Sequence, residues 1–100
     1  MKRVWVVNER FHQYSSAERY GELQPLTQGK VNIFRIDNLV VALTGKLDKL
    51  ASKDDYILVS GYALINALAV HYFLTRFGFA RTLVWGANEQ DYTVVTVNAF

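Results

Sequence analysis

DDYILVSGYALINALAVHYFLTRFG, residues 54–78, is the stretch around which the rest of the chain is expected to fold. Tyr56 to Val59 is a short apolar run between two aspartates and a Ser-Gly pair, which is typical of a strand covered on both faces. The next segment, Tyr62 to Phe77, is long enough for about four turns of helix, and 12 of its 16 residues are apolar. The stretch predicts a buried strand, a break at Ser60-Gly61 and an almost wholly apolar helix.

The rest of the chain supplies strands to pair with this one and a helix to cover it. Runs rich in β-branched and aromatic residues predict four further strands, at 2–8, 22–28, 79–85 and 92–97. A periodic leucine-rich segment predicts a second long helix at 37–50, with Asp37 as its N-cap. Gly45 weakens that helix by roughly 1 kcal/mol relative to alanine and suggests a close crossing. Ser15 or Ser16 can cap a short helix at 16–20.

The order of these elements predicts the fold class. Strands that alternate with helices form parallel sheets with right-handed crossovers, whereas the polar turn before residues 92–97 makes the last two strands an antiparallel hairpin. Pro25 cannot donate a ladder hydrogen bond, so its strand belongs at an edge. We expect a single α/β domain over residues 1–100: three layers and a mostly parallel sheet of order 2-1-3-4-5, with the antiparallel hairpin at its C-terminal edge.

Composition excludes several classes of protein. The chain has no cysteine, which rules out a disulfide framework and thiolate metal sites and fits a reducing compartment. Its net charge of +2 comes from scattered basic residues rather than a one-sided stripe, so nucleic-acid binding is a minor hypothesis. The window from Tyr56 to Leu74 has nearly membrane-spanning length, but its polar residues and the Ser60-Gly61 break favour the strand and helix. No spacing of metal ligands is present, and we expect no metal and no cofactor.

Four segments resemble a group of small phage proteins. They are Val7-Asn8, the His-x-Tyr-Ser-x-Ala-Glu-Arg-aromatic-Gly segment from His12 to Gly21, the segment from Gly29 to Asn32, and the strand from Asp55 to Val59. In these segments the chain is similar to small proteins of tailed phages and viral metagenomes. Where that pattern has Gly before the His and Asp after it, this chain has Phe11 and Gln13. The resemblance implies a viral origin and a setting inside the host cell, and it brings no activity with it.

A ligand site, if the chain has one, is predicted at the carboxyl ends of the first and third strands. With order 2-1-3 the strand order reverses there, which is where open α/β sheets bind ligands. The candidate residues are Asn8, Arg10, His12, Tyr14, Ser15, Arg19, Ser60 and Gly61. In this hypothesis the Ser60 and Gly61 N–H groups hold an anion, Arg10 or Arg19 pairs with it, and His12 is the acid or base.

Each of these residues also has a structural interpretation, which is the more common one. Ser60 can cap the long helix while Gly61 makes the turn. His12 can hydrogen-bond within its own polar loop and pack against a tyrosine. His71, in the middle of the apolar helix, is expected to be a core or interface histidine rather than a ligand. No catalytic residue is assigned on these grounds, and an enzyme is the less favoured reading.

The apolar helix carries the strongest functional signal. Residues that are apolar all round a helix need cover on every side, and a chain of 100 residues has little left to provide it. Leu64, Leu68, Tyr72 and Phe73 are therefore predicted to meet a second copy, most simply in a two-fold dimer. The competing interpretation is that the 37–50 helix and residues 31–36 suffice.

Two functions follow. The favoured hypothesis is a non-enzymatic phage interaction protein of the host cytoplasm that self-associates and binds a host or viral protein. The alternative is an anion- or nucleotide-binding domain, with or without enzymatic activity, whose site is at the carboxyl ends of the first and third strands. Neither hypothesis involves a membrane.

Overall fold

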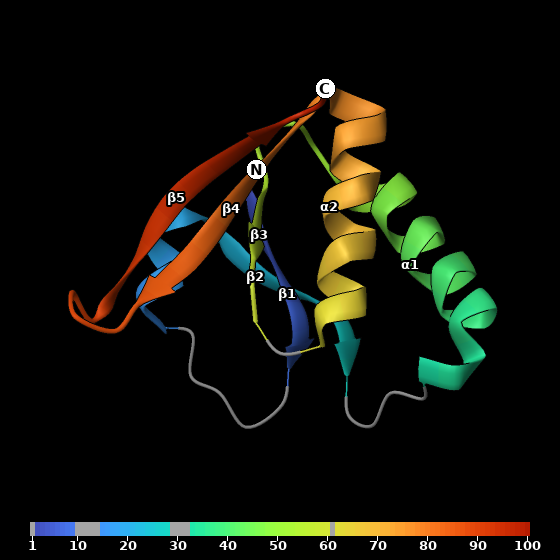
Figure 1. The fold of residues 1–100 in the computed structure, drawn as a ribbon, viewed down its shortest axis with the longest axis horizontal. Helices are drawn as coiled ribbons and strands as arrows, with labels where there is room; N and C mark the ends of the chain where they lie inside the picture. The colour runs from blue at the N-terminus through green and yellow to red at the C-terminus, as the bar shows by residue number, and fades with distance from the viewer. Residues whose placement is uncertain (1, 10–14, 29–32, 61) are drawn as a thin grey trace.

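The sheet of the computed structural model has five strands in the order β2-β1-β3-β4-β5, as predicted (Figure 1). The structure describes residues 2–9, 15–28, 33–60 and 62–100. The strands are β1 (Arg3–Glu9), β2 (Glu22–Gln28), β3 (Tyr56–Leu58), β4 (Phe79–Gly86) and β5 (Asp91–Asn98). The helices are α1 (Ile36–Leu50) and α2 (Ala63–Phe77), with the short 3-10 helices η1 (Ser15–Tyr20) and η2 (Ile33–Arg35).

Strand directions also match the prediction. β1 pairs in parallel with β2 and with β3, and β3 pairs in parallel with β4. β4 and β5 form an antiparallel hairpin in continuous register from Phe79 opposite Asn98 to Gly86 opposite Asp91. β2, which contains Pro25, is an edge strand as expected. The chain is therefore an α/β fold with a mostly parallel sheet.

The two faces of the sheet are covered unequally. α1 and α2 lie on one face, where Trp5, Ile57 and Ala80 of the sheet pack with Leu47 and Phe73 of the helices. On the opposite face, η1 contributes Ala17 to a smaller cluster with Val4, Leu58 and Leu83. Figure 1 shows both helices on the side of the sheet away from η1. One outer layer is thus a pair of helices, and the other is a single 3-10 helix.

Asp55 links the two central strands from the turn before β3. Its carboxyl oxygens accept hydrogen bonds from the Arg3 backbone N–H at 3.0 Å, the Trp5 indole Nε1–H at 2.9 Å and the Ser52 backbone N–H at 2.9 Å. The side chain is buried, so the three donors replace the water that a buried polar group loses. Asp55 therefore fixes the start of β3 against the start of β1.

The helix N-termini differ from the prediction. α1 begins one residue before Asp37, and the residue at its N-cap, Arg35, makes no side-chain capping hydrogen bond. α2 has Tyr62 at its N-cap, also without a side-chain capping bond, so Ser60 is not the cap that its sequence position suggests. At the other end of α2, Gly78 has a φ of 84° and its N–H bonds to the Leu74 carbonyl, which confirms the predicted glycine stop.

Two further features of the helices bear on the predictions. A Cβ atom placed on Gly45 in α1 would have nothing within 4 Å, so this glycine does not mark a close crossing. Among the described residues, no helix has both the length and the apolar character needed to cross a membrane. Within the fold, α2 buries Ile65, Ala69 and Phe73 in the core.

Candidate functional site

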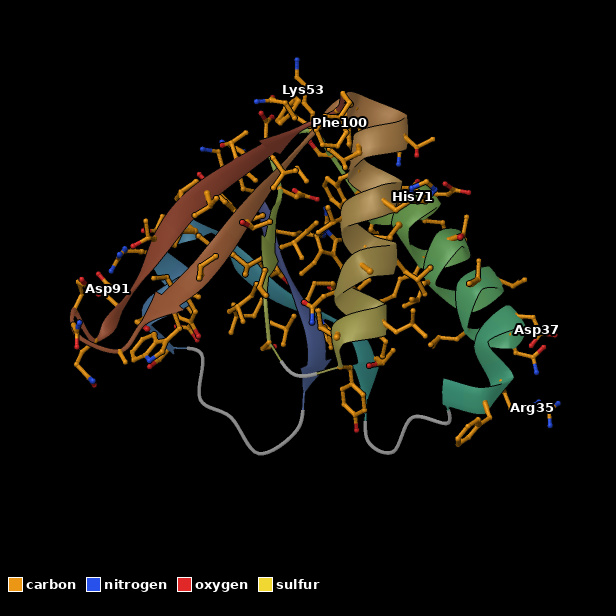
Figure 2. The ribbon with its side chains drawn as sticks, viewed as in Figure 1. Arg35, Asp37, Lys53, His71, Asp91 and Phe100 are labelled. Carbon is orange, nitrogen blue, oxygen red and sulfur yellow. The ribbon has the colours of Figure 1, made fainter. Side chains whose placement is uncertain are left out.

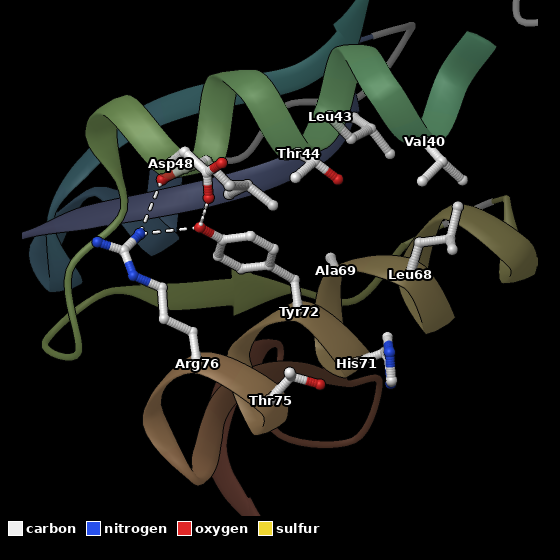
Figure 3. A pocket seen from close by; sticks show the side chains of 11 residues that line it. Val40, Leu43, Thr44, Asp48, Leu68, Ala69, His71, Tyr72, Thr75 and Arg76 are labelled. Carbon is white, nitrogen blue, oxygen red and sulfur yellow. Dashed lines mark hydrogen bonds between the residues drawn. The ribbon is translucent and has the colours of Figure 1, made fainter. Parts of the chain in front are cut away.

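A groove lies between α1 and α2 in the helix layer (Figure 3). Its volume is about 420 Å³, within the range of ~300–1,000 Å³ that is common for ligand sites. Its walls are mostly apolar: Val40, Leu43 and Leu47 from α1, and Leu68 and Ala69 from α2. Helix periodicity places these side chains here, because residues three and four apart lie on one face.

The polar end of the groove is a hydrogen-bonded network between the two helices. The Tyr72 hydroxyl donates to Asp48 Oδ1, and Arg76 Nη1 donates to the Tyr72 hydroxyl at 2.9 Å. The same Arg76 nitrogen donates to the Leu47 carbonyl at 3.1 Å. The guanidinium also lies over the Phe77 ring, 4.8 Å from its centroid. Asp48 and Arg76 are therefore both bonded to the Tyr72 hydroxyl, and this end of the groove helps to join α1 to α2.

This arrangement changes the pKa of the Tyr72 hydroxyl. Partial burial and the hydrogen bond to Asp48 raise the pKa of Tyr72 above its ordinary value, while Arg76 acts in the opposite direction. The neutral hydroxyl, which can donate to Asp48, is the form that the folded protein favours. The network is thus a structural connection with a donor, an acceptor and a cation in fixed places.

The predicted interface residues divide between this groove and the core. Leu68 and Tyr72 line the groove, and Leu64 lies one turn before Leu68 with 47% of its surface exposed. Phe73 is buried in the cluster beneath the helices, so its side chain belongs to the core rather than to an interface. Three of the four residues therefore lie in the groove or next to it, and their role at an interface stays a prediction.

His71 and Thr75 line the exposed side of the same groove. His71 is exposed, so it is a surface residue and not a core one. Sequence reasoning predicted an apolar face on the 37–50 helix but did not assign that face, or Asp48 beside it, to a groove. Its signals were the three- and four-residue spacing of the apolar residues in that helix, and the four-residue spacing of Tyr72 and Arg76, which places both on the face of α2 that meets α1.

Only part of the predicted ligand site can be placed. Arg10, His12, Tyr14 and Gly61 lie outside the described residues, and Asn8 is placed by its backbone, opposite Thr27 of β2. Ser15 is exposed at the start of η1. The acid–base role suggested for His12 stays a prediction.

Arg19 bonds to Asp91 and Tyr20, away from the predicted anion site. Its Nη2 donates to Asp91 Oδ2 at 2.8 Å and to the Tyr20 hydroxyl at 2.9 Å. The hydrogen bond from Arg19 lowers the pKa of Asp91. This exposed ion pair ties η1 to the turn of the β4–β5 hairpin, where Figure 2 shows Asp91 far from His71 in the helix layer.

The backbone N–H and carbonyl of Ser60 are also hydrogen-bonded within the fold. Its backbone N–H donates to Asn66 Oδ1 at 3.3 Å, and its carbonyl accepts from Asn66 Nδ2 at 2.9 Å. Asn66 additionally donates to the Tyr62 carbonyl at 3.1 Å. The first turn of α2 is thus closed by an asparagine from inside the helix, and the Ser60 N–H is not free to hold an anion in this arrangement.

Comparison with known proteins gives one family. A family model described as Phage Pam3 gp32-like protein matches residues 2–99. No curated protein and no solved structure matches the chain. The match covers all five strands and both helices, so it applies to the whole fold described above.

Proposed function

The chain belongs to the Phage Pam3 gp32-like protein family, and from that premise we propose that it is a phage interaction protein that self-associates and binds a protein partner in the host cytoplasm. Its role in this proposal is binding and not catalysis. The partner is a host protein or another component of the phage. The groove between α1 and α2 is the surface that receives it.

The observation that carries the proposal is the apolar groove, which stays open beside α2. Val40 and Leu64 are exposed at the end of the groove away from Tyr72, while Leu43, Leu47 and Leu68 form its walls. Exposed apolar side chains that adjoin an apolar groove are typical of a surface that binds another protein. An apolar helix face fits such a groove with side chains one turn apart.

Charge restricts the kind of partner. Asp48 and Arg76 line the polar end, and because their opposite charges both adjoin the Tyr72 hydroxyl, this network gives the groove no net charge. Burying a charged partner residue without a counter-charge costs several kcal/mol. The groove therefore favours an uncharged apolar segment, with a hydrogen-bonding group where it reaches His71 or Thr75.

A photo-crosslinking experiment in infected cells tests partner binding. Benzoylphenylalanine replaces Leu64, beside the groove, or Val41, an α1 residue that is 74% exposed and does not line the groove. We expect a discrete adduct from position 64 that is absent from position 41. The adduct should disappear when Val40→Asp is added to the position 64 variant, and it should persist when Val41→Asp is added. Equal adducts from both positions, or an adduct that survives Val40→Asp, would contradict the proposal.

Self-association is tested separately by size-exclusion chromatography with light scattering. We expect the molar mass to rise from that of the 11.4 kDa chain toward twice that value as concentration increases. A constant monomer mass up to high micromolar concentration would refute self-association, and it would leave the crosslinking result to decide partner binding.

A further inference from the structure

The outer edge of β5 differs from the opposite edge of the sheet. At the other edge, β2 contains Pro25, which has no N–H, and Lys46 Nζ from α1 donates to the Pro25 carbonyl. Proline and lysine are common means by which proteins prevent a sheet edge from pairing with another chain. β5 has no proline and, from Tyr92 to Asn98, no charged residue. Figure 1 shows β5 at the edge of the sheet, with its hairpin end far from α1 and α2.

Hydrogen bonding shows which backbone groups of β5 point outward. The Ala99 N–H donates to the Gly78 carbonyl, so this pair is bonded across the hairpin. The Leu83 carbonyl accepts from the N–H of Val59, the residue after β3, so Leu83 bonds away from β5. Antiparallel pairs alternate between bonded and non-bonded, so the residues opposite Gly78, Ala80 and Thr82 bond to β4. The N–H and C=O groups of Tyr92, Val94, Thr96 and Asn98 consequently point away from the sheet.

The hairpin end of this edge is already closed. The Tyr92 N–H donates to its neighbour Asp91, and the Tyr92 carbonyl accepts from the Tyr20 hydroxyl at 3.5 Å. In the part of the chain that the structure describes, no group bonds to the outward N–H and C=O groups of Val94, Thr96 and Asn98. These three residues form an open ladder of six backbone groups.

We propose that this ladder pairs with the same ladder of a second copy, in an antiparallel β5–β5 contact with Thr96 on the two-fold axis. Thr96 then exchanges two hydrogen bonds with its counterpart, and Val94 exchanges two with the partner's Asn98 at each end. All three open residues of both strands are satisfied without using Tyr92. Registers centred on Val94 or Val95 require Tyr92, whose groups are already bonded. The two sheets join into one.

Side chains fit the same register. Val95 and Val97 lie opposite Thr82 and Ala80, on the helix side of the sheet, and 44% and 38% of their surfaces are exposed. In this register each Val95 faces the partner's Val97, which places four valines together in the closer, non-bonded pairs. Threonine faces threonine on the other side, a favourable cross-strand pair, and no like charges meet.

This inference rests on the proposed self-association and assigns it to the β5 edge, which leaves the α1–α2 groove of each copy open for the protein partner. A contact along one strand buries less than the ~800 Å² per partner of a standard interface. We therefore expect a dimer whose population depends on concentration. The helix-mediated dimer predicted from Leu64 and Leu68 is the competing arrangement.

Single cysteines distinguish the two arrangements, because the chain contains no other cysteine. On the axis, the two Thr96 Cα atoms would be about 5.5 Å apart, as in a bonded antiparallel pair, and a disulfide spans ~4.4–6.8 Å. Under mild oxidation, Thr96→Cys should form a covalent dimer at least about tenfold faster than Thr93→Cys, whose copies would lie roughly 20 Å apart at ~3.4 Å per residue. Leu64→Cys reports the helix-mediated dimer.

The outcomes separate the two claims. Fast crosslinking of Thr96→Cys, with Thr93→Cys and Leu64→Cys slow, supports β5 pairing. Fast crosslinking of Leu64→Cys alone overturns β5 pairing and retains self-association. A constant monomer mass with slow crosslinking of all three variants overturns both β5 pairing and self-association. This outcome would also be seen if the β5 edge binds an extended segment of another protein instead of a second copy.

Amide exchange of the unmodified chain provides a second measurement that requires no substitution. The N–H groups of Val94, Thr96 and Asn98 should exchange at least about tenfold more slowly at high protein concentration than at low concentration. The N–H group of exposed Lys53, in the turn before β3, serves as the control whose rate does not change. Equal exchange of the three β5 amides at all concentrations would overturn the inference.

Discussion

At the scale of single residues, Asp55 is the polar group on which the core depends most. It is buried between the starts of β1 and β3 and accepts hydrogen bonds from Arg3, Trp5 and Ser52. The sequence placed it only as part of a turn before a strand. Its partners lie up to 52 residues away along the chain, and no local pattern contains that information.

Removing the Asp55 carboxyl group should destabilise the protein strongly. Asp55→Ala leaves three donors without partners, and each buried unsatisfied group costs ~1–3 kcal/mol. We expect the free energy of unfolding to fall by about 3 kcal/mol, measured by urea denaturation. Asp54→Ala is the matched control, because Asp54 is exposed and surface changes usually stay within ~0.5 kcal/mol. Equal effects of the two substitutions would contradict this role.

Tyr72 predicts a pH dependence of stability. Its pKa is raised in the folded state, so its contribution is fully present below the ordinary tyrosine pKa of about 10 and is lost as pH rises through the folded-state value. Tyr72→Phe should cost about 1 kcal/mol at pH 8, where the hydroxyl bonds to Asp48 and Arg76.

The measurement is urea unfolding of both proteins at pH 8 and pH 11. The other tyrosines titrate in both proteins, so the difference between their unfolding free energies isolates Tyr72. That difference should shrink at pH 11. A difference that is the same at both pH values would show that the hydroxyl does not titrate as described.

At the scale of elements, α2 ends where its sequence indicates and begins where it does not. Gly78 supplies the left-handed conformation of the helix stop. The first turn is closed by Asn66, which bonds to both backbone groups of Ser60. A glycine stop is a local conformational requirement, whereas an asparagine that reaches back six residues depends on the path of the intervening loop.

Two glycines predict opposite effects of the same substitution. Gly78→Ala forces a side chain into a φ of 84° and should lower the unfolding free energy by about 1 kcal/mol. Gly45→Ala lies inside α1 with nothing within 4 Å of the new Cβ and should raise the unfolding free energy by about 0.5–1 kcal/mol. Thermal unfolding followed by circular dichroism measures both. A stabilised Gly78→Ala, or a destabilised Gly45→Ala, would contradict the helix geometry.

At the scale of the whole molecule, the unequal layers explain why apolar surface remains. The helix pair covers β1, β3 and part of β4, and η1 covers the opposite face over the same strands. β5 meets η1 only at Asp91 and Tyr92, its first two residues, and its other six residues are exposed. With both helices on one face and η1 on the other, the C-terminal part of β5 and the α1–α2 groove stay open.

The fluorescence of the two tryptophans should report the difference in cover between the central strands and the hairpin. Trp5 is buried in the central strand, whereas Trp85 near the hairpin is about half exposed. In a Trp85→Phe variant the remaining emission should resist iodide quenching until the protein unfolds. It should become quenchable together with the loss of helix measured by circular dichroism, as two-state unfolding requires. Quenching of Trp5 in the folded protein would show that the central strand is accessible.

The sequence by itself determined the element order, the parallel sheet with its antiparallel hairpin, and the edge position of β2. These follow from local signals: apolar runs, helical periodicity, a proline and a glycine. Only the tertiary structure decided that Phe73 belongs to the core while Leu64 is exposed, that Asp48 and Arg76 meet at Tyr72, and that Asn66 occupies the Ser60 N–H. The physical reason is that the sequence of a helix with apolar residues all round does not show which of its faces is buried. The buried face is set by where α1 and the sheet pack against the helix, and that packing depends on contacts between residues distant in the chain.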